Sequence, residues 1–251
     1  MTKQTVLMIH SGGASSRQWR TLATELAPRF HVLVPDLLGY GESGPWPQGE
    51  PFHFRQDVAF LESLLTDGEP VHLVGHSYGG FLALKLALQR PELVRSIAVY
   101  EPVAFGVLDP GELDEVRNTV STVEWRPGPD GSDEAWLRSF IDWWNGAGAW
   151  DRLPEETRKG FRAVGWKVFQ EVMTLGADTT DAATYGTIAV PTLLLGGERT
   201  PLTERRVVER LGVALPRATV RLFPGVGHMG PITHTPLVNG AIAAHLQEWG
   251  G

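Results

Sequence analysis

Short apolar segments alternate with amphipathic segments along most of the chain, and this alternation limits the possible folds more than any other feature. The apolar segments are rich in Val, Leu and Ile, as strands buried on both faces are. They comprise residues 6–10, 32–35, 71–75, 96–100, 192–195 and 219–223. The segments between them that carry helical patterns are 18–26, 54–65, 79–89, 203–211 and 236–249. This order predicts an α/β fold, in which helices flank a mostly parallel sheet.

Residues 103–187 break the alternation, because no strand pattern is found there and helical patterns follow one another. Ser132 is the expected N-cap of a helix that runs to Trp144, and a second helix should open at Pro154. We therefore expect a core of residues 1–102 and 188–251, with a helical cap inserted at 103–187. Most tryptophans of this cap should pack it onto the core, while one or two line an apolar pocket. Six of the nine tryptophans lie in the cap: Trp125, Trp136, Trp143, Trp144, Trp150 and Trp166.

Composition excludes several classes of protein. The 251 residues contain no cysteine, which rules out disulfides, zinc–thiolate sites and a cysteine nucleophile, and fits a reducing compartment. The net charge of −7, without a basic cluster, argues against nucleic acid or an anionic membrane as a partner. No signal peptide is evident, and no apolar run approaches the ~20 residues of a membrane span. We expect a cytoplasmic protein with a small-molecule substrate; the oligomeric state stays open.

The segment 71–75 leads directly into Gly75-His76-Ser77-Tyr78-Gly79, and a helical pattern follows. A sharp strand-to-helix turn exposes the serine hydroxyl, and the two glycines let the backbone pack tightly around it. The N-terminus of the helix then points toward the reacting oxygen, where its dipole favours negative charge. This context predicts that Ser77 is a nucleophile.

A serine nucleophile needs a base within hydrogen-bond reach, and the chain has eight histidines. His228 is the best candidate, because it lies in a glycine-rich loop directly after the last strand segment. That loop is expected at the carboxyl edge of the sheet, where open α/β sheets bind ligands. His76 adjoins Ser77, but its side chain should point away from the serine.

This order of elements resembles the α/β-hydrolase family over almost the whole chain. The resemblance implies a six-stranded sheet, since the N-terminal hairpin common in the family is missing. His10-Ser11-Gly12 is similar to the family's oxyanion loop, with Ser11 in place of a glycine. The resemblance therefore implies that the backbone amides of Gly12 and Tyr78 form the oxyanion hole.

The chain departs from the family at the third member of the triad. Thr200 occupies the position of the usual aspartate, and a hydroxyl cannot supply the charge that stabilises an imidazolium. Glu101, at the end of the fourth strand segment, is one substitute, and some haloalkane dehalogenases and lipases carry their acid at a similar place. Glu198 is another, and a Ser–His dyad is a third possibility. We favour Glu101 over Glu198.

These residues predict a hydrolase without cofactor or metal, which cleaves a small, largely apolar ester or related acyl substrate through an acyl-enzyme on Ser77. Hydroxynitrile lyases and carbon–carbon bond hydrolases resemble the chain equally well at this turn, and a perhydrolase side activity is compatible with it. A non-catalytic ligand-binding protein is a further alternative, because the usual acid is absent. A haloalkane dehalogenase is excluded, since its nucleophile is an aspartate.

Overall fold

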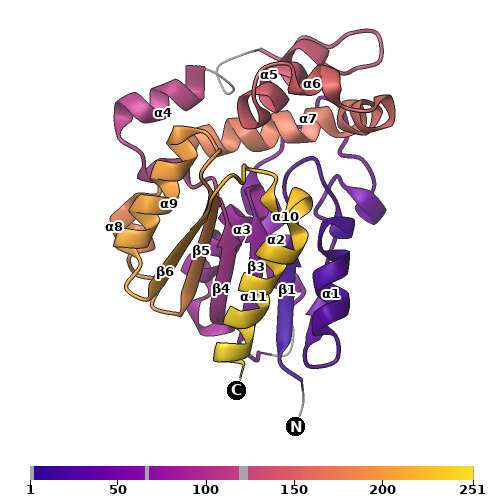
Figure 1. The fold of residues 1–251 in the computed structure, drawn as a ribbon. Helices are drawn as coiled ribbons and strands as arrows, with labels where there is room; N and C mark the ends of the chain where they lie inside the picture. The colour runs from indigo at the N-terminus through magenta and orange to yellow at the C-terminus, as the bar shows by residue number, and fades with distance from the viewer. Residues whose placement is uncertain (1–2, 66–67, 119–123, 251) are drawn as a thin grey trace.

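The computed structural model describes residues 3–65, 68–118 and 124–250, and contains one sheet of six parallel strands (Figure 1). Along the sheet the strands lie in the order β2-β1-β3-β4-β5-β6. Their bounds are β1 Thr5–Ile9, β2 His31–Leu33, β3 Val71–His76, β4 Val94–Tyr100, β5 Thr192–Gly197 and β6 Ala218–Phe223. The predicted six-stranded α/β architecture is confirmed, and every neighbouring pair is parallel.

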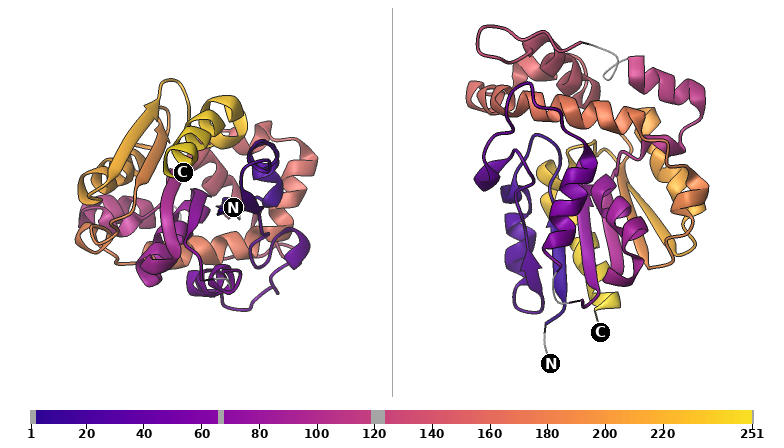
Figure 2. Two further views of the ribbon diagram at one scale, coloured as in Figure 1. Left: turned by 90° about the horizontal axis from the view of Figure 1, so that it is seen from below. Right: turned by 180° about the vertical axis from the view of Figure 1, so that it is seen from behind.

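Helices cover both faces of the sheet because alternate strand residues point to opposite sides. Val6 and Met8 pack on one face against α1 (Arg20–Leu26) and α11 (Thr235–Trp249). Leu7 and Ile9 point to the other face, which α2 (Phe54–Ser63), α3 (Tyr78–Gln89) and α9 (Leu202–Ala214) cover. Figure 2 shows α2 and α3 on the face opposite α1 and α11. Two apolar layers thus hold the sheet rigid beneath the site.

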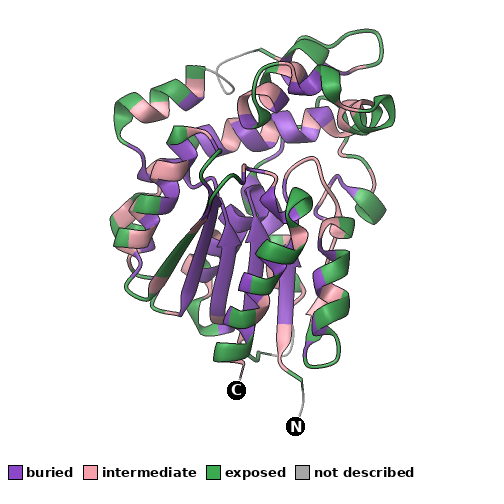
Figure 3. Ribbon diagram, in the orientation of Figure 1, coloured by how far each residue is buried: buried purple, intermediate pink, exposed green. Residues whose placement is uncertain are grey.

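The expectation that all strands are buried on both faces is wrong for the edge of the sheet. Residues Thr219, Val220 and Arg221 of β6 are exposed, whereas β3 is buried throughout (Figure 3). β6 pairs with a neighbour on one side only, so its outer part faces solvent. Polar residues at an outer edge also protect against pairing with other chains.

The segment between β4 and β5 is helical and lies across the carboxyl ends of the strands (Figure 1). Its last helix, α8, packs beside α9 at the flank of the sheet rather than above it. The boundaries of the predicted cap, 103 and 187, stay a prediction, and residues 119–123 within it lie outside the described part. Its helices are α4 Pro110–Val116, α5 Glu134–Asn145, α6 Ala149–Arg152, α7 Glu155–Ala177 and α8 Ala182–Tyr185.

The predicted start of α5 is off by one residue. Asp133, rather than Ser132, is the N-cap, and its carboxylate accepts a hydrogen bond from the backbone N–H of Trp136 at 3.0 Å. Ser132 instead bonds through its own amide and hydroxyl to Asp130. An aspartate satisfies the exposed amides of a first turn as well as a serine does, and its charge also favours the helix dipole.

The close packing at the start of α3 predicts the effect of one methyl group. A Cβ at Gly79 would overlap the backbone carbonyl oxygens of Ile9 and His10, which β1 holds in place. Gly79→Ala should therefore lower the free energy of unfolding in urea by about 1–3 kcal/mol. Gly240→Ala in α11 is the control, because nothing lies within 4 Å of its Cβ. The control should gain up to about 1 kcal/mol from helix propensity, and equal stabilities would contradict this packing.

Candidate active site

Ser77 lies on the turn between β3 and α3, with backbone angles of φ 54° and ψ −120°. A non-glycine residue rarely adopts a positive φ, and such strain is common at functional sites. The turn is possible because Gly75 and Gly79 approach each other closely: a Cβ on Gly75 would lie 2.5 Å from the carbonyl oxygen of Gly79. The backbone thus holds the serine hydroxyl at the carboxyl edge of the sheet.

The fold brings together His228 and Ser77, which are 151 residues apart in the sequence. The loop after β6 carries His228, whose Nε2 lies 3.0 Å from Ser77 Oγ. With a neutral ring, Nε2 accepts the hydroxyl proton and Nδ1 carries a proton of its own. His228 Nε2 is therefore positioned to accept the proton of Ser77, as a base at this site must be.

Glu101 completes the chain of hydrogen bonds. Its Oε2 lies 2.6 Å from Nδ1 of His228, and its carboxylate is fully buried. The amide of Gly197 donates to Oε1 at 2.7 Å, and the hydroxyl of Thr200 donates to Oε2 at 2.8 Å. Glu101 has a φ of 46°, so the backbone is strained at Glu101 as well as at Ser77. Thr200, at the usual position of the aspartate, is thus a hydrogen-bond donor to Glu101.

Glu198, the alternative acid, is exposed to solvent, and its backbone amide donates to the carbonyl oxygen of Phe223 at 3.1 Å. A carboxylate in water at this position cannot orient a buried imidazole. Among the described residues, Glu101 is the carboxylate that contacts His228.

The predicted oxyanion hole has two backbone amides available. Within the described residues, the amides of Gly12 and Tyr78 have no hydrogen-bond partner, whereas the amide of Ser11 donates to Gln18 Oε1 at 3.0 Å. Tyr78 is the first residue of α3, so its N–H lies at the positive end of the helix dipole. Gly12 and Tyr78 line the same cavity as Ser77.

The side chain of His76 does not bond to Ser77 but to the backbone of the loop that carries His228. Its Nε2 donates to the carbonyl oxygen of His228 at 2.9 Å, and Gln18 Nε2 donates to its Nδ1 at 3.0 Å. Gln18 Oε1 also accepts hydrogen bonds from Ser11. Gln18 and His76 together therefore connect the loop of Ser11 to the loop of His228. Burial lowers the pKa of His76 well below its usual value, so the ring stays neutral in this network.

The cap closes a cavity of about 610 Å³ over Ser77. Two cap tryptophans, Trp143 and Trp144, line this cavity. Three others instead contact the ring of Phe169 inside the cap: Trp125, Trp136 and Trp166. Trp144 lies flat on the imidazole of His228, with ring centroids 3.6 Å apart and an interplanar angle of 18°. The sequence did not single out Trp144, because six tryptophans in one segment gave no means of ranking them.

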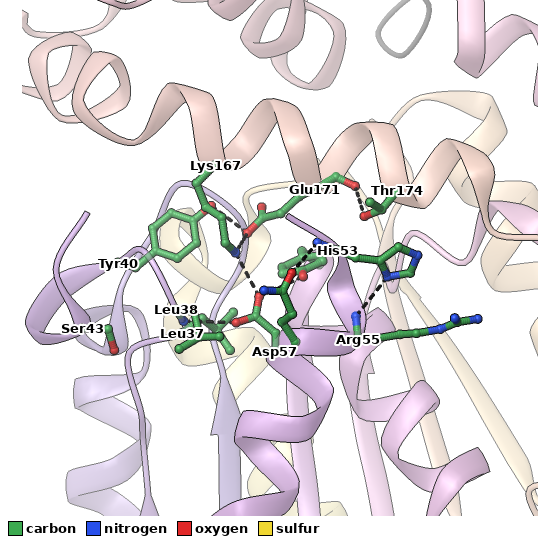
Figure 4. Close-up of polar contacts among 12 residues, drawn as sticks. Leu37, Leu38, Tyr40, Ser43, His53, Arg55, Asp57, Lys167, Glu171 and Thr174 are labelled. Carbon is green, nitrogen blue, oxygen red and sulfur yellow. Dashed lines mark hydrogen bonds and ion pairs between the residues drawn. The ribbon is translucent and has the colours of Figure 1, made fainter. Parts of the chain in front are cut away.

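A buried charge cluster beside the oxyanion loop was also missed. Figure 4 shows Lys167 and Glu171 of α7 extending toward Asp57 of α2. Lys167 Nζ lies 2.9 Å from Asp57 Oδ2 and 2.8 Å from Glu171 Oε1, and the three side chains are at most 2% exposed. The hydroxyl of Tyr78 also donates to Asp57, and that of Tyr40 donates to Glu171. Sequence spacing gave a misleading signal, because a Lys–Glu pair four residues apart usually lies on an exposed helix face.

Burial of this cluster changes the titration of its carboxyl groups. Loss of hydration raises the pKa of Glu171 to about 7, although the nearby Lys167 ammonium acts in the opposite direction. Burial likewise raises the pKa of Asp57, opposed by Lys167 and by three hydrogen bonds. Two carboxyl groups thus share one ammonium, and Glu171 is the one that takes up a proton near neutral pH.

In the described part of the chain, no three His, Asp or Glu side chains form a group that could hold a metal ion. Nor does any helix there combine the length and hydrophobicity that a transmembrane span requires.

Residues 6–239 match the model of the alpha/beta hydrolase family. The chain belongs to this family. Over 114 residues it is 40% identical to the lipase LipV of Mycobacterium tuberculosis, a match that covers 44% of the chain and 41% of the lipase. Among solved structures, MenH from S. aureus superposes with a TM-score of 0.78 at 19% identity, covering 100% of the chain and 96% of MenH. A thermophilic esterase from Thermogutta terrifontis superposes at 0.69 with 21% identity, over 100% of the chain and 92% of the esterase.

The similarity to the curated relatives extends over only part of their length. The curated relatives match over less than half of their own length, 41% for the lipase and 28% for an acetyltransferase component of an acetoin-cleaving system from Cupriavidus necator. The solved structures, with identities below a quarter, show the shared fold. The comparisons therefore establish the family and, for the solved structures, the shared fold.

The titration of Glu171 predicts how stability depends on pH. A folded-state pKa of about 7, raised from 4.5, means that folded protein holds a proton that unfolded chain releases. Glu171 therefore stabilises the fold less as the pH rises from about 4.5 to about 7, by up to about 3 kcal/mol. Glu171→Gln lacks this titration, and the acids outside the cluster of Asp57, Lys167 and Glu171 titrate equally in both proteins.

Urea unfolding of both proteins across this range is the measurement. The stability of the wild type relative to Glu171→Gln should fall with rising pH. Parallel stability curves would contradict the proton on Glu171.

Proposed function

We propose that this protein is a cofactor-free serine hydrolase that cleaves a small, largely apolar carboxylic ester or related acyl substrate. The observation that carries the proposal is the continuous chain of hydrogen bonds from Ser77 through His228 to Glu101, beside a largely apolar cavity under the cap. In this proposal the three residues are nucleophile, base and acid.

The reaction begins when Ser77 Oγ attacks the substrate carbonyl carbon and His228 Nε2 accepts the hydroxyl proton. The carbonyl oxygen becomes an oxyanion between the amides of Gly12 and Tyr78, each of which contributes on the order of 3 kcal/mol in comparable sites. His228 then passes its proton to the alcohol that leaves, and an acyl group remains on Ser77. In the second half of the cycle, His228 deprotonates a water molecule, which attacks the acyl group on Ser77. This releases the carboxylic acid product and restores the serine hydroxyl.

Two contacts stabilise the imidazolium that forms on His228. The carboxylate of Glu101 faces Nδ1, and the indole of Trp144 lies against the ring face. A cation on the face of an indole is attracted by the electron density of the ring, by about 1–2 kcal/mol where water is excluded. The cap thus supports the base directly as well as closing the cavity.

The alternatives receive less support from the site. A lyase that relies on a lysine in the pocket lacks that group near Ser77, since Lys167 is held by Asp57 and Glu171 and does not line the cavity. A non-catalytic binding protein was considered because the usual acid is absent, but Glu101 fills its place in the geometry. We therefore favour the ester hydrolase.

Replacement of the nucleophile tests the proposal. Ser77→Ala should lose labelling by a fluorophosphonate probe and lower turnover of p-nitrophenyl acetate by a factor on the order of 10⁴ or more. His228→Ala should lose turnover to a similar extent, because the two residues act as a unit. The melting temperature of Ser77→Ala should stay within about 2 °C of the wild type, since the hydroxyl fills no part of the core. Covalent labelling that persists in Ser77→Ala would refute the assignment.

A further inference from the structure

One polar atom faces the apolar cavity without a partner. Glu171 lines the cavity and is only 2% exposed, and its Oε1 is bound by Lys167 and Tyr40. Its Oε2 accepts no hydrogen bond from any residue in the described part of the chain. Because Glu171 lines the cavity, a substrate group that enters can supply to Oε2 the hydrogen bond that no described residue provides.

The position of Oε2 relates it to the reacting atoms. A Cβ built on Gly12 would come within 2.5 Å of Oε2, so this oxygen lies against the backbone of the oxyanion loop. His228 must reach the leaving oxygen, so the leaving group occupies the side of Ser77 next to His228 and Trp144. Glu171 accordingly faces the part of the cavity beside the oxyanion, where the acyl group lies.

The charge of the cluster defines which group suits Oε2. Lys167 balances one of its two carboxylates, so a second full negative charge near the oxyanion would oppose the reaction. Near neutral pH Glu171 exists both protonated and ionised, because burial raises its pKa to about 7. An ammonium can only donate to Oε2 and a ketone can only accept from it, whereas a hydroxyl does both.

We propose that Glu171 is a specificity-determining residue that hydrogen-bonds a hydroxyl on the acyl chain of the substrate, so that the preferred substrates are short hydroxyacyl esters. This inference rests on the proposed ester hydrolysis and adds to it the chemistry of the acyl group. The apolar walls of the cavity hold the carbon chain, and Glu171 supplies the polar contact that orients it.

The test compares three esters that differ by one hydroxyl: ethyl butyrate, ethyl 2-hydroxybutyrate and ethyl 3-hydroxybutyrate. Acid release at constant pH gives kcat/KM for each with the wild type, Glu171→Gln and Glu171→Met. The wild type should prefer one of the hydroxylated esters over ethyl butyrate by roughly ten-fold, the effect of one hydrogen bond to a buried, partly charged group.

Glu171→Met should abolish this preference: the ratio of kcat/KM for the preferred hydroxylated ester to kcat/KM for ethyl butyrate should fall to about one, because a thioether cannot replace the carboxyl group as donor and acceptor. Glu171→Gln should keep part of the preference, because an amide also donates and accepts. Folding of the Met variant is expected, since it leaves Lys167 and Asp57 as a balanced pair. Glu156→Met, at an exposed position of the same helix, is the matched control and should behave as the wild type.

A preference that survives unchanged in Glu171→Met would overturn the inference, as would equal kcat/KM values for all three esters in the wild type. Both results would leave the proposed hydrolase intact, because ethyl butyrate is cleaved. If no ester is cleaved and the fluorophosphonate probe does not label Ser77, the proposed function fails, and this inference fails with it.

Discussion

The hydrogen bond between Glu101 and His228 is the contact on which the arrangement of the site depends. It joins the end of β4, in the middle of the sheet, to the loop after β6 at its edge, across the end of β5. Gly197 and Thr200, at and just after the end of β5, donate to the same carboxylate. Three neighbouring strand ends are therefore fixed around one charge, and the imidazole they orient reaches Ser77 on β3's turn. Strain at Glu101 and Ser77 is tolerated because the buried sheet holds both.

A second set of contacts ties the cap to this core. Lys167 and Glu171 of α7 meet Asp57 of α2, and Tyr78, next to the nucleophile, donates to Asp57. Removal of Lys167 from this buried network would leave its carboxylates uncompensated and cost several kcal/mol. The cluster therefore helps to fix α7 against α2. It also brings a carboxyl group to an otherwise apolar cavity.

The sequence predicted the sheet, its strand order of appearance and the helical insertion, because apolar periodicity reports burial. It also placed Ser77 and His228 on loops at one edge of the sheet, since each follows a strand directly. Glu101 was favoured over Glu198 because its strand neighbours the strand of Ser77 and some members of the family carry their acid at a similar place, and the structure brings Glu101 to His228. The relation between Thr200 and Glu101 was not predictable, because it depends on the spacing of β4 and β5.

The charge cluster and the stack of Trp144 on His228 could not be derived from the chain alone. Lys167, Glu171 and Asp57 have the spacing and polarity of surface residues, and only the packing of α7 onto α2 buries them. β6 misled in the opposite direction, since its apolar segment lies at an exposed edge. Contacts between distant elements decide these features, and periodicity within one element does not report them.

The central claim, that the acid has moved to β4, is tested most directly by kcat for ester hydrolysis in Glu101→Gln beside Glu198→Gln. An amide keeps the shape of Glu101 but removes the charge that stabilises the imidazolium and selects its tautomer. The account predicts that kcat falls by a factor on the order of 10³–10⁴ in Glu101→Gln, as the equivalent change does in the serine-protease triad. It predicts that Glu198→Gln retains wild-type kcat. An active Glu101→Gln, with or without an impaired Glu198→Gln, would contradict it.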